Sequence, residues 1–310
     1  MHNRLWFWIL FNLFVLVVLT LDLALFHRRP REIKFREALG SSVFWIALAA
    51  AFALFIFFES GRVKTLEFIT AYVVEESLSV DNLFIFLLIF RYFKVAGEQQ
   101  HKVLFWGILG ALVTRGIFIL AGVTLLREFH WIIYVFGGFL VYTGCRLFEE
   151  NEQKIEPERN PVLRLFRRFL PVSEDYVDGK FFVMRAGRRL ATPLFMVVLA
   201  VEATDIVLAA DSIPAVLAIT PDPFIVYTSN VFAVIGLRAL YFLLAGMMNV
   251  FHFLNYGLAA VLILIGAKML ASDYYHVSTG LTLVVVAGIL AISIALSLMF
   301  PQRTRTEEKA

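Results

Sequence analysis

The chain has 310 residues, of which 60% are hydrophobic and 17% are charged, and its formal net charge is +3. A soluble domain carries roughly 25% charged residues, so the composition excludes an ordinary soluble protein. The small positive charge does not predict nucleic-acid binding, because basic residues of membrane proteins collect in cytoplasmic loops. Cys145 is the only cysteine, which excludes an intrachain disulfide and a thiolate metal cluster. We expect Cys145 to pack against apolar neighbours.

Apolar stretches recur along the chain with the length of about 16 to 25 residues that crosses a hydrocarbon core of roughly 30 Å. Continuous apolar runs cross lipid as helices, since barrel strands alternate apolar and polar residues. The sequence therefore predicts an all-α polytopic membrane protein with nine transmembrane helices. These are expected near residues 5–26, 43–58, 66–92, 103–126, 131–148, 192–219, 223–248, 255–271 and 277–299.

The basic residues predict the orientation of these helices. One side of the predicted membrane receives most Lys and Arg, in residues 27–37, 91–102, 149–190 and 302–310. The other side receives only Arg4, Arg62, Lys64 and Arg127. The positive-inside rule then places the N-terminus outside and the C-terminus in the cytoplasm of a bacterial cytoplasmic membrane. Residues 1–26 lack a small-residue cleavage site and predict a retained helix rather than a signal peptide.

The segment 149–190 is the one sizeable soluble piece. Its stretch PVLRLFRRFLPV (161–172) alternates basic and apolar residues, as an interfacial helix on anionic headgroups does. The stretch DGKFFVMRAGRRLAT (178–192) predicts a hairpin that turns at Ala186-Gly187. This basic loop is either a linker between two halves or a docking surface for a protein partner.

The polar residues inside the spans repeat along the chain. VEATDIVLAADSIPAV (201–216) resembles VVEESLSVDNLFIF (73–86), with Asp81 aligned on Asp211 and Glu75 on Asp205. GALVTRGIF (110–118) matches AVIGLRALY (233–241), and YVFGGFLVYTGCRLF (134–148) matches YGLAAVLILIGAKML (256–270). Three matches in the same order indicate a duplication.

Each repeat unit holds three predicted spans, so the second copy enters the membrane inverted. Inverted repeats are typical of secondary transporters, which bind substrate near the membrane midplane between the halves. The expected organisation is peripheral helices in 1–65, a first repeat in 66–148, the basic loop in 149–190, a second repeat in 191–271, and a last helix with a cytoplasmic tail in 272–310.

Acidic residues inside these spans need partners. Each acid at a helix centre opposes insertion by about 2.5–3.5 kcal/mol, so the acids must face one another, a cation or water. Carboxylate, amide and hydroxyl oxygens suit hard divalent cations such as Mg²⁺, Mn²⁺ or Ca²⁺. The predicted counter-ion or gating residues are Arg115, Arg238 and Asn230. Glu76 has no acidic counterpart in the second copy. For Glu76, pairing with another side chain or snorkelling is therefore weighed equally with a role in the cation site. Asp22 is expected to form a local ion pair.

Helical geometry limits how the acids cooperate. Glu75 and Asp81 are six residues apart, about 240° around an ideal helix, and cannot point to one place from a straight helix. In the second copy Pro214 is expected to bend the helix beside Asp211. The first copy has no proline, which predicts either a broken helix or two separate sites. Buried Arg–Asp pairs that only hold helices together are the structural alternative.

EESLSVDN (75–82), VEATDIVLAADSIPAV (201–216) and DPFIVYTSNVFAVIGLRALYFLL (222–244) resemble the TerC family of integral membrane proteins. The resemblance extends over essentially the whole chain, including FFV (181–183) and ATPL (191–194). It implies an association with tellurium resistance and, as in several members, manganese efflux. The resemblance also implies which residues line the cation path: Glu75, Asp81, Asn82, Glu202, Asp205, Asp211 and Ser212.

These observations predict an exporter of divalent cations, with Mn²⁺ as the preferred transported ion, in exchange for protons. A channel or uniporter fits the same residues. The alternative from another class is a membrane scaffold that helps to metalate or assemble secreted or membrane enzymes, with tellurite resistance as an indirect result. An intramembrane aspartyl protease is a remote third option, so we expect no enzyme activity and no permanently bound cofactor. The expected partners are the lipid bilayer, divalent metal ions and a protein at residues 149–190.

Overall fold

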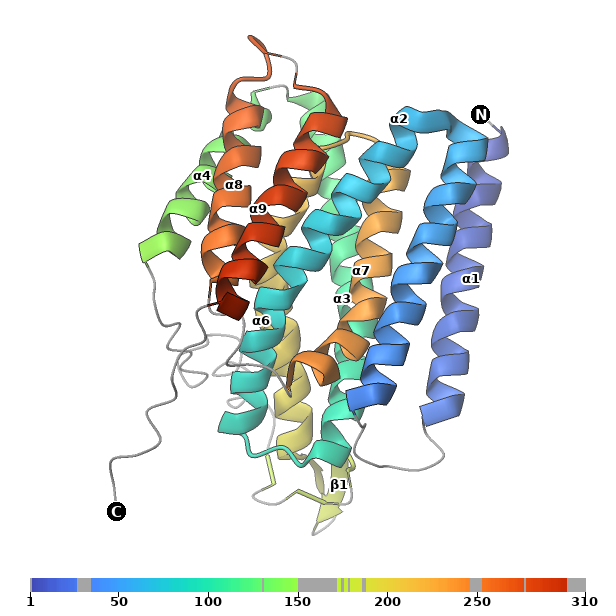
Figure 1. Cartoon of the computed structure of the whole chain (residues 1–310). Coiled ribbons are helices and arrows are strands. Elements are labelled where there is room, and N and C mark those ends of the chain that lie inside the picture. Colours follow the sequence, from blue (N-terminus) through green and yellow to red (C-terminus); the bar gives the residue numbers. More distant parts are fainter. Residues whose placement is uncertain are drawn as a thin grey trace.

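The computed structural model describes residues 2–26, 35–129, 131–149, 172–173, 176–177, 179–185, 188–245, 253–275 and 277–299. These residues form eight α-helices and one two-stranded sheet (Figure 1). The elements are α1 (His2–Phe26), α2 (Phe35–Tyr92), α3 (Gly97–Glu128), α4 (Ile132–Glu149), β1 (Phe182–Arg185), β2 (Arg188–Ala191), α6 (Pro193–Leu217), α7 (Pro223–Ala245), α8 (Leu254–Leu270) and α9 (Thr279–Met299).

The lengths and apolar composition of these helices suit a membrane. Within the described residues, α2, α3, α6, α7 and α9 are each long and apolar enough to cross one, and α1, α4 and α8 contain shorter apolar stretches. The predicted helical class is therefore confirmed. The number of crossings stays a prediction, partly because α2 joins two of the predicted spans.

The two predicted spans in α2 meet at Gly61, where the backbone leaves helical geometry with φ 82° and ψ 177°. This positive φ favours glycine, which has no Cβ to clash. The chain reverses its direction along the bundle there (Figure 1). Beyond Gly61 the helix continues unbroken through residues 75–82. This excludes the broken-helix alternative for the first copy and leaves two separate sites as the prediction. α6 also runs unbroken past Pro214 to Leu217.

The helices pack in a central group with others around it. α2 packs on α6 and α7, and α3 packs on the same two helices. α4 pairs with α8, and α9 covers α2 and α8. α1 lies at the edge of the bundle (Figure 1), where Phe11 places its ring 5.3 Å from Phe52 of α2 and 5.8 Å from Phe232 of α7. The central group therefore positions the polar residues, and α1 and the first arm of α2 cover it from one side.

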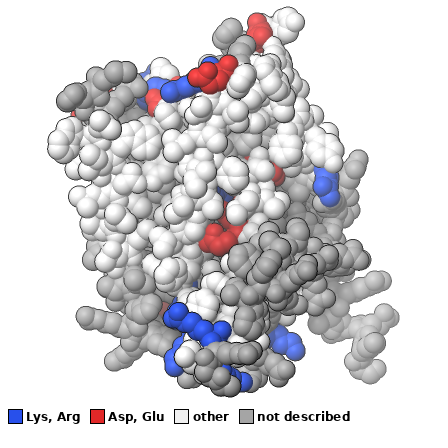
Figure 2. All heavy atoms as spheres, turned by 180° about the vertical axis from the view of Figure 1, so that it is seen from behind, with Lys and Arg blue, Asp and Glu red and all other residues white. Residues whose placement is uncertain are grey.

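The outer surface of the bundle is apolar at mid-height. Large hydrophobic side chains such as Leu16 of α1, Ile117 of α3 and Val284 of α9 are exposed. In Figure 2 most Lys and Arg atoms gather at the lower end, where the sheet lies in Figure 1, and a small group of acidic atoms interrupts the uncharged middle. An uncharged belt between charged ends is the surface expected of a protein that spans a bilayer.

The hairpin predicted in the basic loop is confirmed by β1 and β2, which pair antiparallel with Phe182 opposite Ala191 and Arg185 opposite Arg188. Its turn at 186–187 and the predicted interfacial helix at 161–171 lie outside the described residues. Next to the hairpin, Lys102 of α3 donates a 2.6 Å hydrogen bond to the carbonyl oxygen of Gly179. The described part of the loop is therefore fixed to the end of the helical bundle.

Close contact between α4 and α8 depends on two glycines. A Cβ built on Gly266 would lie 2.7 Å from the carbonyl oxygen of Gly137, and one on Gly144 would lie 2.8 Å from that of Ala259. Real Cβ atoms do not approach backbone oxygens so closely, so a larger residue would push the helices apart. Cys145, next to Gly144, is exposed on α4 and does not pack inside this chain, so its expected apolar packing stays a prediction.

We expect Gly266→Ala to destabilise the protein by about 1–3 kcal/mol, because the added methyl group overpacks the helix contact. Gly138→Ala is the matched control, since a Cβ there meets nothing within 4 Å. Thermal unfolding of the purified variants in detergent measures the difference. Equal melting temperatures for the two variants would show that α4 and α8 do not depend on this contact.

Candidate cation site

Arg115 of α3 lies between carboxylates from two other helices. Its Nη1 donates a 2.8 Å hydrogen bond to Oε2 of Glu75 on α2. Its Nε and Nη2 donate to the two carboxylate oxygens of Asp205 on α6, at 3.2 and 3.0 Å. Such a two-point contact fixes the plane of the guanidinium as well as its distance. The structure thus brings together the two acids that the repeat aligns with each other.

A fourth helix completes this group. Asn230 of α7 donates a 2.7 Å hydrogen bond from Nδ2 to Oε1 of Glu75, so each oxygen of that carboxylate has a different donor. We call Glu75, Arg115, Asp205 and Asn230 the Arg115 cluster. All four residues are buried. The cluster therefore connects α2, α3, α6 and α7 in the centre of the bundle.

The Arg115 cluster holds more negative than positive charge when both acids are ionised. Glu75 and Asp205 contribute two negative charges and Arg115 one positive charge, which leaves a formal charge of −1. The pairing lowers the penalty of burying the three ions, although desolvation offsets much of the attraction. The residual negative charge makes this position attractive to a further cation.

Glu202 lies one turn before Asp205 on α6. Its carboxylate rests directly on Gly110 of α3, where a Cβ would collide with it. Oε1 of Glu202 is buried and has no hydrogen-bond partner among the described residues, and the same holds for Oγ of Ser212. Buried polar atoms nearly always have partners, so these two oxygens are available to a bound ion or water.

A cavity of about 10 Å³ adjoins the Arg115 cluster. Asp205 and Arg238 supply the charged part of its lining, and Gly107 and Ala111 of α3 form part of its wall. A cavity needs about 10–15 Å³ to hold one water molecule. The space beside Asp205 is therefore about the size of a single small occupant.

The other predicted site residues differ in burial, and not all of their side chains are described. Asn82 is buried on α2, Asp211 is partly buried on α6, and the side chain of Asp81 lies outside the described part, as does that of Asp22. The assignment of Asp81 to the cation path therefore stays a prediction. Among the side chains that the structure describes, no three His, Cys, Asp or Glu residues form a metal-ligand group.

The carboxylate of Glu76 faces Gly236 of α7. Its Oε1 lies 3.8 Å from the position that a Cβ on Gly236 of α7 would occupy, and Trp45 lies beside the same glycine. Oε2 of Glu76 is buried without a hydrogen-bond partner in the described part of the chain. The carboxylates of adjacent residues Glu75 and Glu76 therefore face different neighbours.

A second polar group, which the sequence does not predict, lies beside Gly61. Nζ of Lys64 lies 2.8 Å from Oε2 of Glu67 and 3.2 Å from Oδ2 of Asp222. Thr220 donates a 2.6 Å hydrogen bond to the same oxygen of Glu67. These contacts tie the second arm of α2 to the α6–α7 turn. Lys64 had been assigned to a loop, so nothing in the sequence indicated that it pairs with Asp222.

Gly110 was also missed, although an isolated glycine within a helical pattern can signal close approach of another group. The apolar helix around it gave no reason to connect Gly110 with Glu202, which is 92 positions further along the chain. Only the packing of α3 on α6 brings the two residues together.

We expect Arg115→Met to destabilise the protein by about 3–5 kcal/mol, because it leaves Glu75 and Asp205 buried without their cation. Thermal unfolding in detergent measures the loss, with the exposed Arg127→Met on the same helix as control. Adding Glu75→Gln and Asp205→Asn to Arg115→Met should restore part of the stability. If Arg115→Met melts like Arg127→Met, the ion pairs do not stabilise the bundle.

Comparisons with known proteins agree with the membrane fold. Residues 60–305 match the model of the integral membrane protein TerC family. A protein of Myxococcus xanthus named "Uncharacterized membrane protein STKORF319" is 47% identical over 301 residues, which cover 97% of this chain and 94% of the relative.

Two enterobacterial relatives carry the name "Putative membrane-bound redox modulator Alx". The protein of Salmonella typhi is 42% identical over 93% of this chain and 92% of its own length. That of Escherichia coli K12 is 42% identical over 91% of each chain. No solved structure matches the chain. The family match and the apolar helices together identify the chain as a multi-pass integral membrane protein of the TerC family.

Proposed function

We propose that the protein exports a divalent metal cation across the bacterial cytoplasmic membrane, with Mn²⁺ as its preferred cargo. The observation that carries the proposal is the meeting of Glu75 and Asp205, from α2 and α6, on one buried arginine. Ionisable groups within a membrane bundle are expensive to insert and usually mark a substrate or ion pathway. Buried ion pairs that only hold helices together would not require the additional oxygens of Glu202 and Ser212.

An inverted repeat is supported by two equivalent glycine contacts between α4 and α8. Gly144 packs on the carbonyl of Ala259, and Gly266 packs on that of Gly137. The sequence alignment equates Gly144 with Gly266 and Gly137 with Ala259, so each contact maps onto the other. Such reciprocity is what a two-fold axis between α4 and α8 produces, and it supports the proposed inverted repeat. The alignment also equates Glu75 with Asp205, so the proposed axis relates two acids of the Arg115 cluster, as expected of a substrate site in such transporters.

Arg115 acts as a tethered counter-ion in this proposal. With no cargo bound, its guanidinium pairs with both Glu75 and Asp205 and offsets part of their charge. An arriving divalent cation competes with Arg115 for the carboxylate oxygens. Glu202, one turn from Asp205 on α6, can add a further oxygen ligand at this position. Asp211 and Ser212 lie about two turns further along α6 and can bind the cation at a second position on its path. Protons that return through the acids can balance the exported charge.

The nature of the donors favours a hard cation. The candidate residues offer carboxylate, amide and hydroxyl oxygens, and such ligands suit Mn²⁺, Mg²⁺ or Ca²⁺. The redox name of two relatives fits this proposal indirectly, because the level of a redox-active metal affects cellular redox state. Direct thiol–disulfide exchange within one chain requires two cysteines, and this chain has only Cys145.

The charge distribution supports the proposed orientation. The hairpin end carries the exposed basic residues Lys180, Arg185 and Arg189, and in Figure 2 this end is the most positive part of the visible face. By the positive-inside rule the hairpin end faces the cytoplasm and the break at Gly61 faces outward. Export then runs from the hairpin end past the Arg115 cluster towards Lys64 and Asp222.

A metal-delivery scaffold is the second candidate. The exposed hairpin favours it, because Met184 is 71% exposed between basic neighbours and offers a surface to a protein partner. In that case, deletion of residues 161–172 should abolish capture of the partner and leave metal flux unchanged. If the protein is an exporter without a partner, the same deletion should change neither the capture of other proteins nor the metal flux.

Proteoliposomes loaded with Mn²⁺ test the export proposal. We expect wild-type protein to release Mn²⁺, and Asp205→Asn, Asp81→Asn and Asp211→Asn to reduce the rate by at least about tenfold, as expected when a cation loses a carboxylate ligand. Glu128→Gln, at an exposed position at the end of α3, is the control and should keep the wild-type rate. Equal flux in all five proteins would contradict the site assignment.

A further inference from the structure

A cavity of about 320 Å³ lies beside the break in α2, at the end of the bundle opposite the hairpin. It shares no residue with the Arg115 cluster. Its volume falls in the range of about 300–1,000 Å³ that is usual for small-molecule sites. The cavity is therefore large enough to take a ligand of its own.

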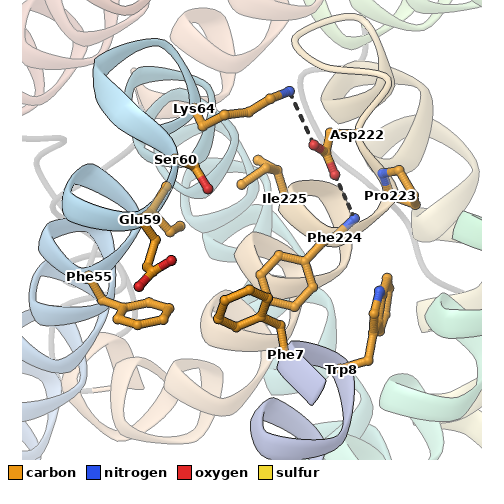
Figure 3. A pocket seen from close by; sticks show the side chains of 11 residues that line it. Phe7, Trp8, Phe55, Glu59, Ser60, Lys64, Asp222, Pro223, Phe224 and Ile225 are labelled. Atoms are coloured by element: carbon orange, nitrogen blue, oxygen red, sulfur yellow. Dashed lines mark hydrogen bonds and ion pairs between the residues drawn. The ribbon is translucent and has the colours of Figure 1, made fainter. Parts of the chain in front are cut away.

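Aromatic rings from three helices form much of its wall (Figure 3). Phe7 and Trp8 come from α1, Phe55 from α2 and Phe224 from α7. The ring centroids of Phe7 and Phe55 are 6.0 Å apart, and those of Trp8 and Phe224 are 5.3 Å apart. These contacts make a continuous apolar wall that suits a hydrocarbon chain.

The charges around the cavity leave one carboxylate uncompensated. Lys64 is held by Glu67 and Asp222, at 2.8 and 3.2 Å, so its ammonium is already balanced. Glu59 also lines the cavity, and Figure 3 shows its carboxylate near the ring of Phe55. Among the described side chains, none forms an ion pair or hydrogen bond with Glu59. A ligand in this cavity therefore meets an unbalanced negative charge next to aromatic rings.

This combination selects among cations. A hard divalent metal needs six or more oxygens, whereas the cavity offers only those of Glu59, Ser60 and Asp222, and Asp222 is already paired with Lys64. An organic ammonium needs only one carboxylate, and aromatic faces attract it further through cation–π contacts. We propose that the cavity binds the ammonium group of an amphiphile, with Glu59 as its ion partner and the aromatic wall against its hydrocarbon part. The ammonium could come from a phosphatidylethanolamine headgroup or from a water-soluble alkylamine.

Two binding experiments on the full-length protein separate these sources. Thermal shifts in detergent compare octylamine with octanol, which has the same chain length but no charge. Native mass spectrometry then counts the lipids retained after reconstitution with phosphatidylethanolamine or with phosphatidylglycerol of the same acyl chains. Both experiments use the wild type, Glu59→Gln and the control Glu128→Gln, which is exposed on α3 outside the cavity.

We expect Glu59→Gln to weaken ammonium binding by about fivefold to tenfold, as for a partly exposed charge pair aided by aromatic rings. The control should bind as the wild type does. Selective retention of phosphatidylethanolamine points to the lipid source, and stabilisation by octylamine but not octanol points to the soluble amine. Two results would overturn the proposal. In the first, octanol stabilises the protein as much as octylamine does and both lipids are retained equally. In the second, Glu59→Gln binds the ammonium ligands as tightly as the wild type does.

Discussion

The burial of Arg115 between Glu75 and Asp205 is the constraint on which the rest of the structure depends. Three ions in the centre of an apolar bundle are tolerated only if each one has partners in the right geometry. Those partners come from α2, α3, α6 and α7, so these four helices must meet at one point. The arrangement of the central bundle follows from this requirement as much as from apolar packing.

The frame around the Arg115 cluster is built from close backbone contacts. Where α4 meets α8, the glycines remove the side chains that would separate them. Gly110 does the same on α3, where the space that it leaves is filled by the carboxylate of Glu202. In lipid, helices gain little from hydrophobic association, so small residues that allow close van der Waals contact are the usual means of holding them together. Glycines therefore allow both the close contact of α4 with α8 and the position of the Glu202 carboxylate against α3.

Much of this organisation could be predicted from the sequence because rare polar residues in apolar helices are informative. The pairing of Glu75 with Asp205 followed from the repeat, and Arg115 was expected to neutralise acids. The contacts of Gly110 and Lys64 could not be predicted, since they depend on how distant helices pack and on the turn at Gly61. The structure excludes the broken-helix alternative for residues 75–82, because α2 runs unbroken through them, and it leaves two separate sites as the prediction.

The most direct test of the Arg115 cluster as a cation site is Mn²⁺ binding followed by electron paramagnetic resonance. Bound Mn²⁺ loses the sharp signal of the free ion, so a titration of purified protein gives the number of sites and their affinity. We predict saturable binding to the wild type and its loss in a variant carrying both Glu75→Gln and Asp205→Asn. Equal binding by the two proteins would contradict the assignment of the cluster as the site of the transported cation.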